Sequence, residues 1–216
     1  MRELPAGHDA VMLDFSGHPA PTEAVSRATA ALHAARTAGT LLIADVVPSA
    51  QTVLVQADRG NGIDTLGVHR ALRTGDASVA TAGGADDELR IPVVYDGPDL
   101  ADVARLLDVD IPRVVELHTN TLWQVQFMGF APGFGYLIPH DEPDHPLRTV
   151  GRRSESRTRV PRGAVAIAAG YSAVYPRVSP GGWQLLGATS MTMWDEAAVP
   201  PARLRPGSLV RFVADE

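Results

Sequence analysis

Six arginines fall within fifteen residues in the second half of the chain, and Glu155 is the only acidic residue among them. Guanidinium groups bind carboxylates and phosphates through paired, parallel hydrogen bonds. The run therefore favours an anion site over a solvated basic loop. Alternate residues of a strand share a face, so we expect Arg157 and Arg159, with Arg152, to bind the anion. The whole run comprises Arg148, Arg152, Arg153, Arg157, Arg159 and Arg162.

The histidines suggest two other kinds of chemistry. His118 ends a predicted helix, where the helix dipole stabilises an imidazolium; that role is favoured, and reaching the anion site is the alternative. His140 and His145 flank an acidic loop with the residue types of a metal site. Prolines interrupt this loop and no helix sets a ligand spacing, so we favour a solvated loop and predict no metal. No nucleophile elbow surrounds Ser179, and no self-contained catalytic set is visible.

Two turns rich in aromatic residues are candidates for the walls of a pocket. The first, FAPGFGY, either caps one end of a barrel or forms a flat apolar wall for a small ligand. The second, YPRVSPGGWQLLG, contains a predicted turn at Ser179–Gly182, followed by the start of a buried strand. It is either a stiff hairpin corner or the lip of a binding site. The candidate wall residues are Phe130, Pro132, Gly133, Phe134, Tyr136, Tyr175, Ser179, Pro180, Gly181, Gly182 and Trp183.

Composition excludes several kinds of function. The 216 residues contain no cysteine, which rules out disulfides, thiolate metal sites and a cysteine nucleophile. All nineteen basic residues are arginine, so Schiff-base chemistry and a Walker-type phosphate loop are absent. A net charge of −6 argues against nucleic-acid binding. With no apolar run of membrane length and no signal-peptide core in MRELPAGHDAVMLDF, we expect a cytoplasmic protein that binds no membrane.

The first part of the chain has the pattern of a small α/β domain. Apolar spacing predicts a helix over 21–38, with Pro21 in its first turn and Gly39 after its end. A shorter helix is expected over 64–72. Strands are expected over 9–16, 41–47 and 53–55. The small, polar segment 81–87 is the expected boundary, giving domains at 1–84 and 85–216.

The second part is predicted to be mainly β. A strand over 89–95 precedes two short helices, and Asp99 and Asp110 have the position and chemistry of their N-caps. Further strands are expected over 123–127, 165–168, 183–186, 191–194 and 209–213. Many short strands between proline and glycine turns are typical of a closed barrel or sandwich. The predicted fold class is α+β.

Three motifs resemble the family of 5-oxoprolinase B subunits. They are HTNTLWQVQFMGFAPGFGYL, RTRVPRGAVAIAAG and YPRVSPGGWQLLGAT, in that order. The family is also known as allophanate hydrolase subunit 1 and includes the KipI-type inhibitor of a sporulation histidine kinase. The resemblance is strongest from about Ile91 onward, and over residues 1–80 it concerns topology alone.

This resemblance implies a cyclophilin-like β-barrel for the second domain and work within a complex. The B subunit of 5-oxoprolinase acts with a C subunit, which is a second cyclophilin-like chain, and with an A subunit. The complex uses ATP to open 5-oxoproline to glutamate. Related modules form the carboxyltransferase part of biotin-dependent urea carboxylase. If the chain is such an enzyme component, Arg157 and Arg159 hold a substrate carboxylate or a phosphate of ATP. If it is an inhibitor instead, the aromatic turns contact a histidine kinase. A third alternative is a carboxyltransferase or allophanate-related role, which needs a biotin-bearing partner.

The chain departs from the family pattern at several positions. Gly151-Arg152 and Ser156-Arg157 keep the arginine of two Pro-Arg pairs but lose the proline. Tyr171, Ser172 and Ala173 stand where relatives usually have Gln-Thr-Gly, and the strand after Pro48 lacks the usual Tyr-Arg-Ser. These departures near a predicted pocket bear on the identity of the substrate.

Overall fold

The computed structural model describes residues 1–74 and 88–215. The described residues form two compact units, one on either side of residues 75–87. The boundary expected at 81–87 lies outside the described residues, so the division at 84 and 85 stays a prediction. The two units, called here the N-terminal unit and the barrel unit, are described separately.

A four-stranded antiparallel sheet in the order β1-β2-β4-β3 forms the N-terminal unit. Its strands are β1 (Arg2–Pro5), β2 (Ala10–Asp14), β3 (Asp45–Pro48) and β4 (Thr52–Gln56). The sequence pattern predicted β2 and β4 but missed β1, whose four residues are all exposed and so carry no apolar alternation. The strand expected over 41–47 is shorter than predicted, because only 45–48 pair with β4.

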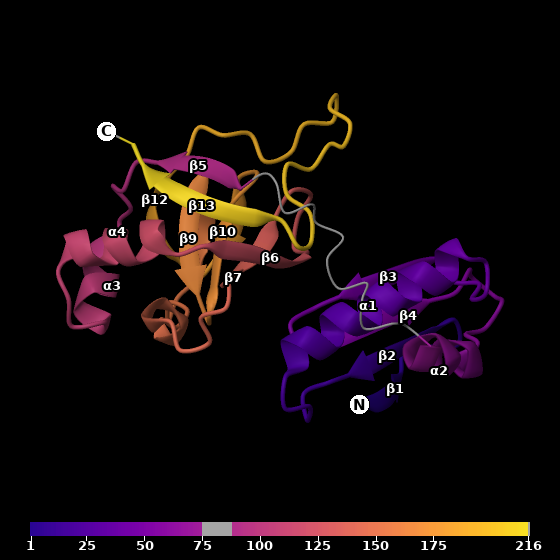
Figure 1. Ribbon diagram of the computed structural model, residues 1–216. Coiled ribbons are helices and arrows are strands. Elements are labelled where there is room, and N and C mark those ends of the chain that lie inside the picture. The colour runs from indigo at the N-terminus through magenta and orange to yellow at the C-terminus, as the bar shows by residue number, and fades with distance from the viewer. Residues whose placement is uncertain (75–87, 216) are drawn as a thin grey trace. The chain divides into compact units, whose positions relative to one another are not determined.

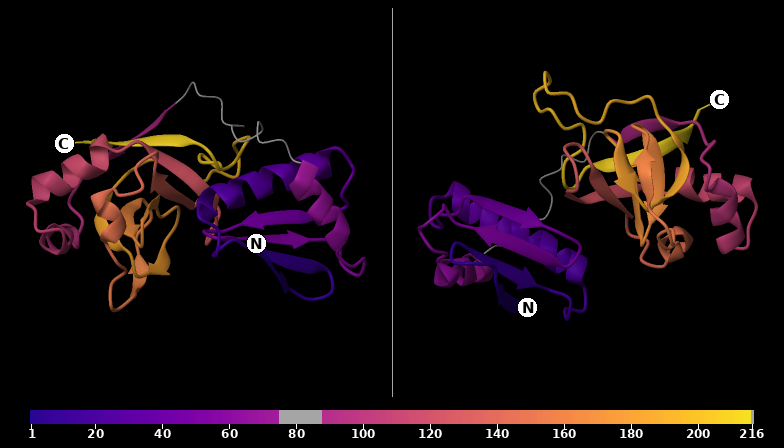
Figure 2. Two further views of the ribbon diagram at one scale, coloured as in Figure 1. Left: turned by 60° about the horizontal axis from the view of Figure 1, so that its bottom comes forward. Right: turned by 180° about the vertical axis from the view of Figure 1, so that it is seen from behind.

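The helices α1 (Pro21–Thr37) and α2 (Thr65–Thr74) cover one face of this sheet (Figures 1 and 2). In α1 the apolar positions repeat at three- and four-residue spacing, and Val25, Ala28 and Leu32 are buried against the sheet. Pro21 occupies the first turn, where its missing N–H is not needed. Both helices therefore follow the prediction.

A seven-stranded sheet in the order β12-β9-β10-β7-β6-β13-β5 forms the barrel unit. Its strands are β5 (Leu89–Val93), β6 (Trp123–Met128), β7 (Gly135–Pro139), β9 (Ala164–Ala168), β10 (Tyr171–Val174), β12 (Gln184–Ala188) and β13 (Leu209–Ala214). Figures 1 and 2 show the sheet curling around a central core. That core contains Trp123, Leu137, Ile167, Leu186 and Phe212, all 1% exposed or less.

The sheet is brought almost to closure by hydrogen bonds between its two edge strands. Just after β5, the N–H of Val94 donates to the carbonyl of Ala188 at 2.9 Å, and the reverse bond has the same length. Gly187 makes this approach possible, because a Cβ there would lie 2.2 Å from the Val94 carbonyl oxygen. The predicted α+β class, with a small sheet-and-helix unit before a barrel-like sheet, is confirmed.

Two short helices, α3 (Leu100–Leu106) and α4 (Ile111–Asn120), follow β5. Asp110 caps α4 as predicted, since its carboxylate accepts the N–H of Arg113 at 2.9 Å. Asp99 occupies the N-cap position of α3 as predicted, and its backbone carbonyl accepts the N–H of Val103 at 2.9 Å, but its side chain makes no capping bond. None of the described helices is both long and apolar enough to cross a bilayer.

The β predictions failed in other places as well. Strands β7 and β10 were not predicted. Residues 191–194 form no strand, and only Trp194 makes an isolated bridge, to Ala202. The predicted turn at 179–182 instead contains β11 (Ser179–Gly181), which pairs antiparallel with β8 (Arg157–Val160) in a small separate sheet. Pro180 and Gly181 disfavour a strand locally, so the pattern gave no signal for it. A 3₁₀ turn (Pro146–Thr149) completes the unit.

Candidate functional site

The carboxylate of Asp99 lies at the centre of the arginine run. Its side chain is 2% exposed. Oδ1 accepts hydrogen bonds from Arg153 and, at 2.8 Å, from Arg157, while Oδ2 accepts the backbone N–H of Leu185 at 2.7 Å. Burial alone would raise the pKa of this carboxyl, but the bonds from Arg157 and Leu185 and the charges of both arginines outweigh it. The pKa of Asp99 is therefore held below its usual value.

The segment 175–187 positions this cluster through three backbone contacts. Gly181 pairs with Arg157 across the β8–β11 sheet, and the Gly182 carbonyl accepts the N–H of Arg153 at 2.8 Å. Leu185 supplies the backbone donor to Asp99. A Cβ on Gly181 would lie 2.3 Å from the Tyr175 hydroxyl, and one on Gly182 would lie 2.8 Å from the Ser156 hydroxyl. Gly181 is thus needed for close approach to the buried Tyr175, whereas the exposed Ser156 hydroxyl could turn away from a Cβ on Gly182; neither glycine has a positive φ.

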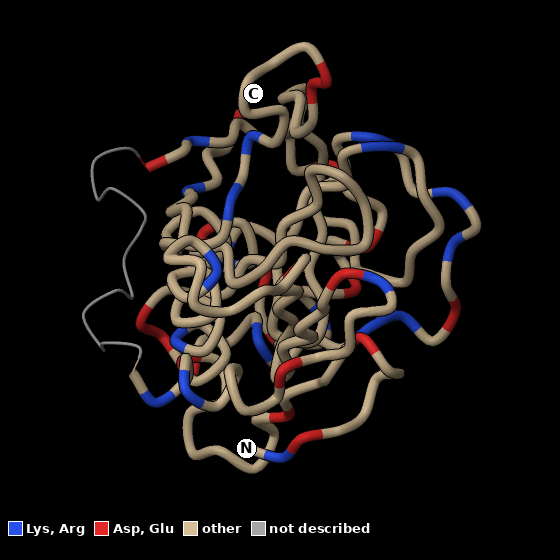
Figure 3. Tube along the Cα trace, turned by 90° about the vertical axis from the view of Figure 1, so that its right-hand side faces the viewer, with Lys and Arg blue, Asp and Glu red and all other residues tan. Residues whose placement is uncertain are grey.

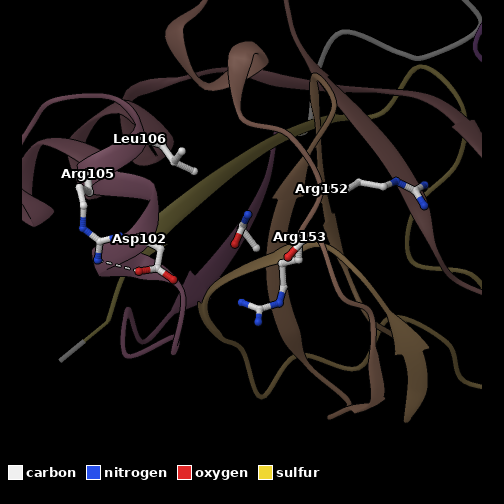
Figure 4. Close-up of a pocket in the computed structure, with 7 residues that line it drawn as sticks. Asp102, Arg105, Leu106, Arg152 and Arg153 are labelled. Carbon is white, nitrogen blue, oxygen red and sulfur yellow. Dashed lines mark hydrogen bonds and ion pairs between the residues drawn. The ribbon is translucent and has the colours of Figure 1, made fainter.

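A cavity of about 330 Å³ opens beside the cluster (Figure 4). In the figure Arg105 pairs with Asp102, at 2.8 Å, and Arg152 extends away from that pair. Two buried atoms of residues around the cavity have no hydrogen-bond partner among the described residues: Nε of Arg153 and Oε1 of Gln184. Its lining consists of Asp102, Arg105, Leu106, Arg152, Arg153, Ser154 and Gln184.

The arginines proposed from the sequence are in different situations. Arg157 is committed to Asp99, and its Nη1 is buried without a partner among the described residues. Arg159 and Arg152 are exposed and make no ion pair within the described part of the chain. Acidic and basic positions are interspersed along the trace (Figure 3). The structure therefore joins Arg157 to Arg153 through Asp99 and leaves Arg159 outside that contact.

The five aromatic residues among the eleven predicted wall residues form a cluster over a layer of alanines. Phe134, Tyr175 and Trp183 are at most 5% exposed and pack over Ala164, Ala166, Ala168 and Ala173. Phe134 contacts Tyr136, Tyr175 and Trp183 edge to face, with ring centroids 5.0, 5.3 and 5.7 Å apart. Phe130 has a φ of +65° and is 57% exposed. The main effect of the cluster is to bury apolar surface. Of the predicted wall aromatics, only Phe130 and the partly exposed Tyr136 present much ring surface to solvent.

The remaining wall residues have structural positions. Gly133 has a φ of +81°, and a Cβ there would lie 2.9 Å from the Met193 carbonyl oxygen. Pro132 lies in the same turn. Ser179 is 7% exposed and donates its hydroxyl to the Arg177 carbonyl at 3.2 Å, while Pro180 is exposed. These residues shape the two turns, which favours the alternative of a stiff hairpin corner over the lip of a binding site.

His118 lies in the barrel core and is fully buried. Its Nδ1 is 2.7 Å from the Tyr95 hydroxyl, its Nε2 is 2.9 Å from the Ser172 hydroxyl, and its ring stacks on Phe212 at 4.3 Å. Burial, with a smaller effect of His145, lowers its pKa to about 3. The imidazole is therefore neutral at pH 7. The imidazolium expected at this helix end is not present, and a neutral ring has no positive charge with which to bind an anion. His118 is left out of the site proposed below.

The buried His118 predicts a loss of stability in acid. The ordinary pKa is 6.5 and the folded value is about 3, so below pH 6.5 the unfolded chain takes up a proton that the folded chain refuses. The free energy of unfolding should fall between these two values by up to about 1.4 kcal/mol per pH unit. Urea denaturation at pH 7 and pH 5 should show a loss of about 2 kcal/mol.

A His118→Asn variant provides the control, because its remaining pH dependence reports the other groups. His145 contributes in the same direction, since burial also lowers its pKa. Equal stability of the wild type at both pH values would mean that His118 is protonated in the folded protein.

In the acidic loop at 140–145, His145 is held by other groups of the protein. His145 is 6% exposed, its Nε2 lies 2.8 Å from the Thr121 hydroxyl, and its Nδ1 accepts the N–H of Leu147. The prediction of a solvated loop is therefore wrong for His145, which packs beside Trp123. Within residues 1–74 and 88–215, no group of three or more suitable side chains could hold a metal ion.

Residues 1–204 match the family described as carboxyltransferase domain, subdomain C and D. The chain belongs to this family. Among curated relatives, the 5-oxoprolinase B subunit of Escherichia coli O157:H7 is 47% identical over 128 residues. That alignment covers 58% of this chain and 57% of the relative, so it spans little more than half of the relative's length. The resemblance stated from the three motifs is confirmed.

Solved structures of other proteins have a similar fold. The protein TTHA0988 aligns over 96% of this chain with a TM-score of 0.78 and 35% identity, yet the match covers only 40% of that longer chain. The uncharacterized protein PH0987 from Pyrococcus horikoshii aligns over 100% of this chain and 98% of its own, with a TM-score of 0.56 and 28% identity. The fold of this carboxyltransferase family member thus occurs both in a longer chain and in one of similar length.

Sequence reasoning missed two members of the site. Asp99 was assigned to a helix cap, and no local pattern marks it, since its arginine partners lie 54 and 58 positions away. Gln184 looked like one residue of a buried strand. The signal present in the sequence is Gly181, because a Cβ there would clash with the buried Tyr175 beside Arg157.

Proposed function

We propose that this chain is the B subunit of an ATP-dependent 5-oxoprolinase, which works with an A subunit and a C subunit to open 5-oxo-L-proline to L-glutamate. The observation that carries the proposal is the 47% identity to the 5-oxoprolinase B subunit of Escherichia coli O157:H7. The site is consistent with a chain that is inactive alone. It offers an arginine cluster and buried aromatic walls, but no group among the described residues is placed as a nucleophile.

In this proposal the chain contributes binding and charge. The cluster of Arg153, Arg157 and Asp99 carries a net charge of +1, which suits one carboxylate of the substrate. A low-dielectric environment strengthens such charge contacts, and the aromatic walls behind β11 keep water from that side of the cluster.

ATP does not fit the described residues of this chain. The cavity beside Asp99 is lined by Asp102 as well as by Arg105, Arg152 and Arg153, and a net charge of +2 cannot balance a triphosphate. The chain also has no lysine for a phosphate loop. We therefore place ATP on another chain of the complex.

The alternative of a histidine-kinase inhibitor requires aromatic anchors on the surface. Phe134, Tyr175 and Trp183 are buried, Phe130 is exposed and Tyr136 is partly exposed. One exposed and one partly exposed ring are a weak basis for such an interface. The enzyme component is for this reason the preferred proposal.

Co-expression with candidate A and C subunits, followed by an assay of glutamate release from 5-oxo-L-proline, tests the proposal. We expect a stable complex whose ATP-dependent turnover requires every chain. Assembly without turnover would show that the changes at Tyr171, Ser172 and Ala173 accompany a different substrate. No assembly, together with dose-dependent loss of kinase autophosphorylation, would favour the inhibitor instead.

A further inference from the structure

The cavity beside α3 contains a buried amide that the protein itself leaves almost unused. Gln184 is 6% exposed and follows Trp183 into the core strand β12. Its Nε2 lies 3.5 Å from the Gly151 carbonyl, at the limit of a hydrogen bond, and its Oε1 has no partner among the described residues. Buried polar groups are nearly always paired, so an amide left in this state calls for an explanation.

The same cavity has an excess of positive charge. Asp99 neutralises one of the two arginines that bind it, and the exposed pair of Asp102 and Arg105 cancels itself. Arg152 also lines the cavity and makes no ion pair among the described residues. Nε of Arg153 is a further buried donor without a partner in the described structure. An unsatisfied cationic donor and an unsatisfied amide acceptor therefore belong to two residues that line one cavity.

We propose that this cavity binds a small carboxylate that also carries an amide-type N–H. The carboxylate would meet the guanidinium of Arg153, and the N–H would be donated to Oε1 of Gln184. The volume of about 330 Å³ is at the small end of ligand sites. The amide of Gln184 needs to turn at its last torsion to present Oε1 to the ligand; this torsion is soft, and the bond of Nε2 to Gly151 is easily given up.

The cavity, its charge and the unpaired atoms do not depend on the enzymatic assignment, whereas the choice of 5-oxo-L-proline as probe rests on the proposed function. This lactam acid has both groups that the site lacks. 2-Pyrrolidinone keeps the ring amide without the carboxylate, and acetate keeps the carboxylate without the N–H. Together the three probes separate recognition of the carboxylate by Arg153 from recognition of the N–H by Gln184.

The test is calorimetric titration of the purified full chain with each probe. We expect 5-oxo-L-proline to bind with a millimolar or lower Kd and each control probe at least tenfold more weakly. Gln184→Met should weaken binding of 5-oxo-L-proline at least tenfold without lowering the midpoint of thermal unfolding, because it removes an unsatisfied acceptor. Arg153→Gln, which leaves Asp99 paired with Arg157, should weaken it by a similar factor. Gln124→Met, on β6, is the matched control and should bind normally.

Absence of 5-oxo-L-proline binding at 10 mM, or equal binding by the Gln184→Met protein, would overturn the inference. Equally tight binding of sulfate would also overturn it, since it would show a nonspecific anion site. Binding by the chain in a complex without turnover would refute the proposed function and leave the site standing. Turnover by the complex without binding at this cavity would support the proposed function and refute the ligand site.

Discussion

Replacing Asp99 by asparagine is expected to lower the free energy of unfolding by about 3 kcal/mol. The change keeps the shape of the side chain but removes the only carboxylate that Arg153 and Arg157 share among the described residues. Two guanidinium groups, 29% and 24% exposed, would then face each other without a counter-charge. The new amide would also turn an N–H toward a donor, either an arginine or the Leu185 N–H.

Urea denaturation at pH 7 measures this effect, and Asp102→Asn is the matched control. Asp102 also pairs with an arginine, Arg105, but the two side chains are 49% and 75% exposed. Exposed pairs contribute at most about 1 kcal/mol. Equal effects of the two substitutions would show that the Asp99 cluster is solvated, and the charge argument for the cavity would fail with it.

Replacing Gly187 by alanine is expected to destabilise the barrel unit by about 3 kcal/mol, the upper part of the range for overpacked sites. The new Cβ would lie 2.2 Å from the Val94 carbonyl oxygen and 3.0 Å from the Tyr95 Cα. Both contacts are backbone, so neither can be relieved by turning a side chain. The strands could separate, but that would break the two hydrogen bonds between Val94 and Ala188.

Thermal or urea unfolding of the purified chain checks this result, with Gly151→Ala as the control. A Cβ on Gly151 meets nothing within 4 Å, and this glycine has no positive φ. The control should therefore change stability by less than about 0.5 kcal/mol. An unaltered unfolding midpoint for Gly187→Ala would mean that the edge strands do not meet in solution.

The elements that could be predicted are those whose burial is periodic. Helix α1 presents Val25, Ala28 and Leu32 at helical spacing, and β6 alternates Trp123 with Val125, so local pattern and tertiary burial agree. Strand β11 could not be predicted, because it is held by pairing with β8 and not by its own residues. The prediction of a strand at 191–194 was wrong because these residues alternate like a strand but have no partner strand to pair with; only Trp194 makes an isolated bridge.

The site was predictable only in its charge. A run of arginines indicates an anion, but the sequence cannot tell that the first anion to be bound is the protein's own Asp99. The same limit applies to His118, whose neutrality follows from complete burial against Tyr95, Ser172 and Phe212. Contacts between residues far apart in the chain decide these properties, and no local spacing encodes them.

The pairing of β5 with β13 also sets the order in which the barrel unit can fold. β13 lies between β6 and β5, and its register joins Val210 to Leu89 and Ala214 to Val93. The first strand of the unit, β5, therefore cannot pair until the last strand, β13, is available, more than a hundred residues later in the chain. Contacts this distant slow folding because closing the long loop between them costs entropy. On the ribosome, β5 and β6 would emerge long before the strand that fits between them. Until Ala214 has left the exit tunnel, both keep an unpaired edge on which other chains can aggregate.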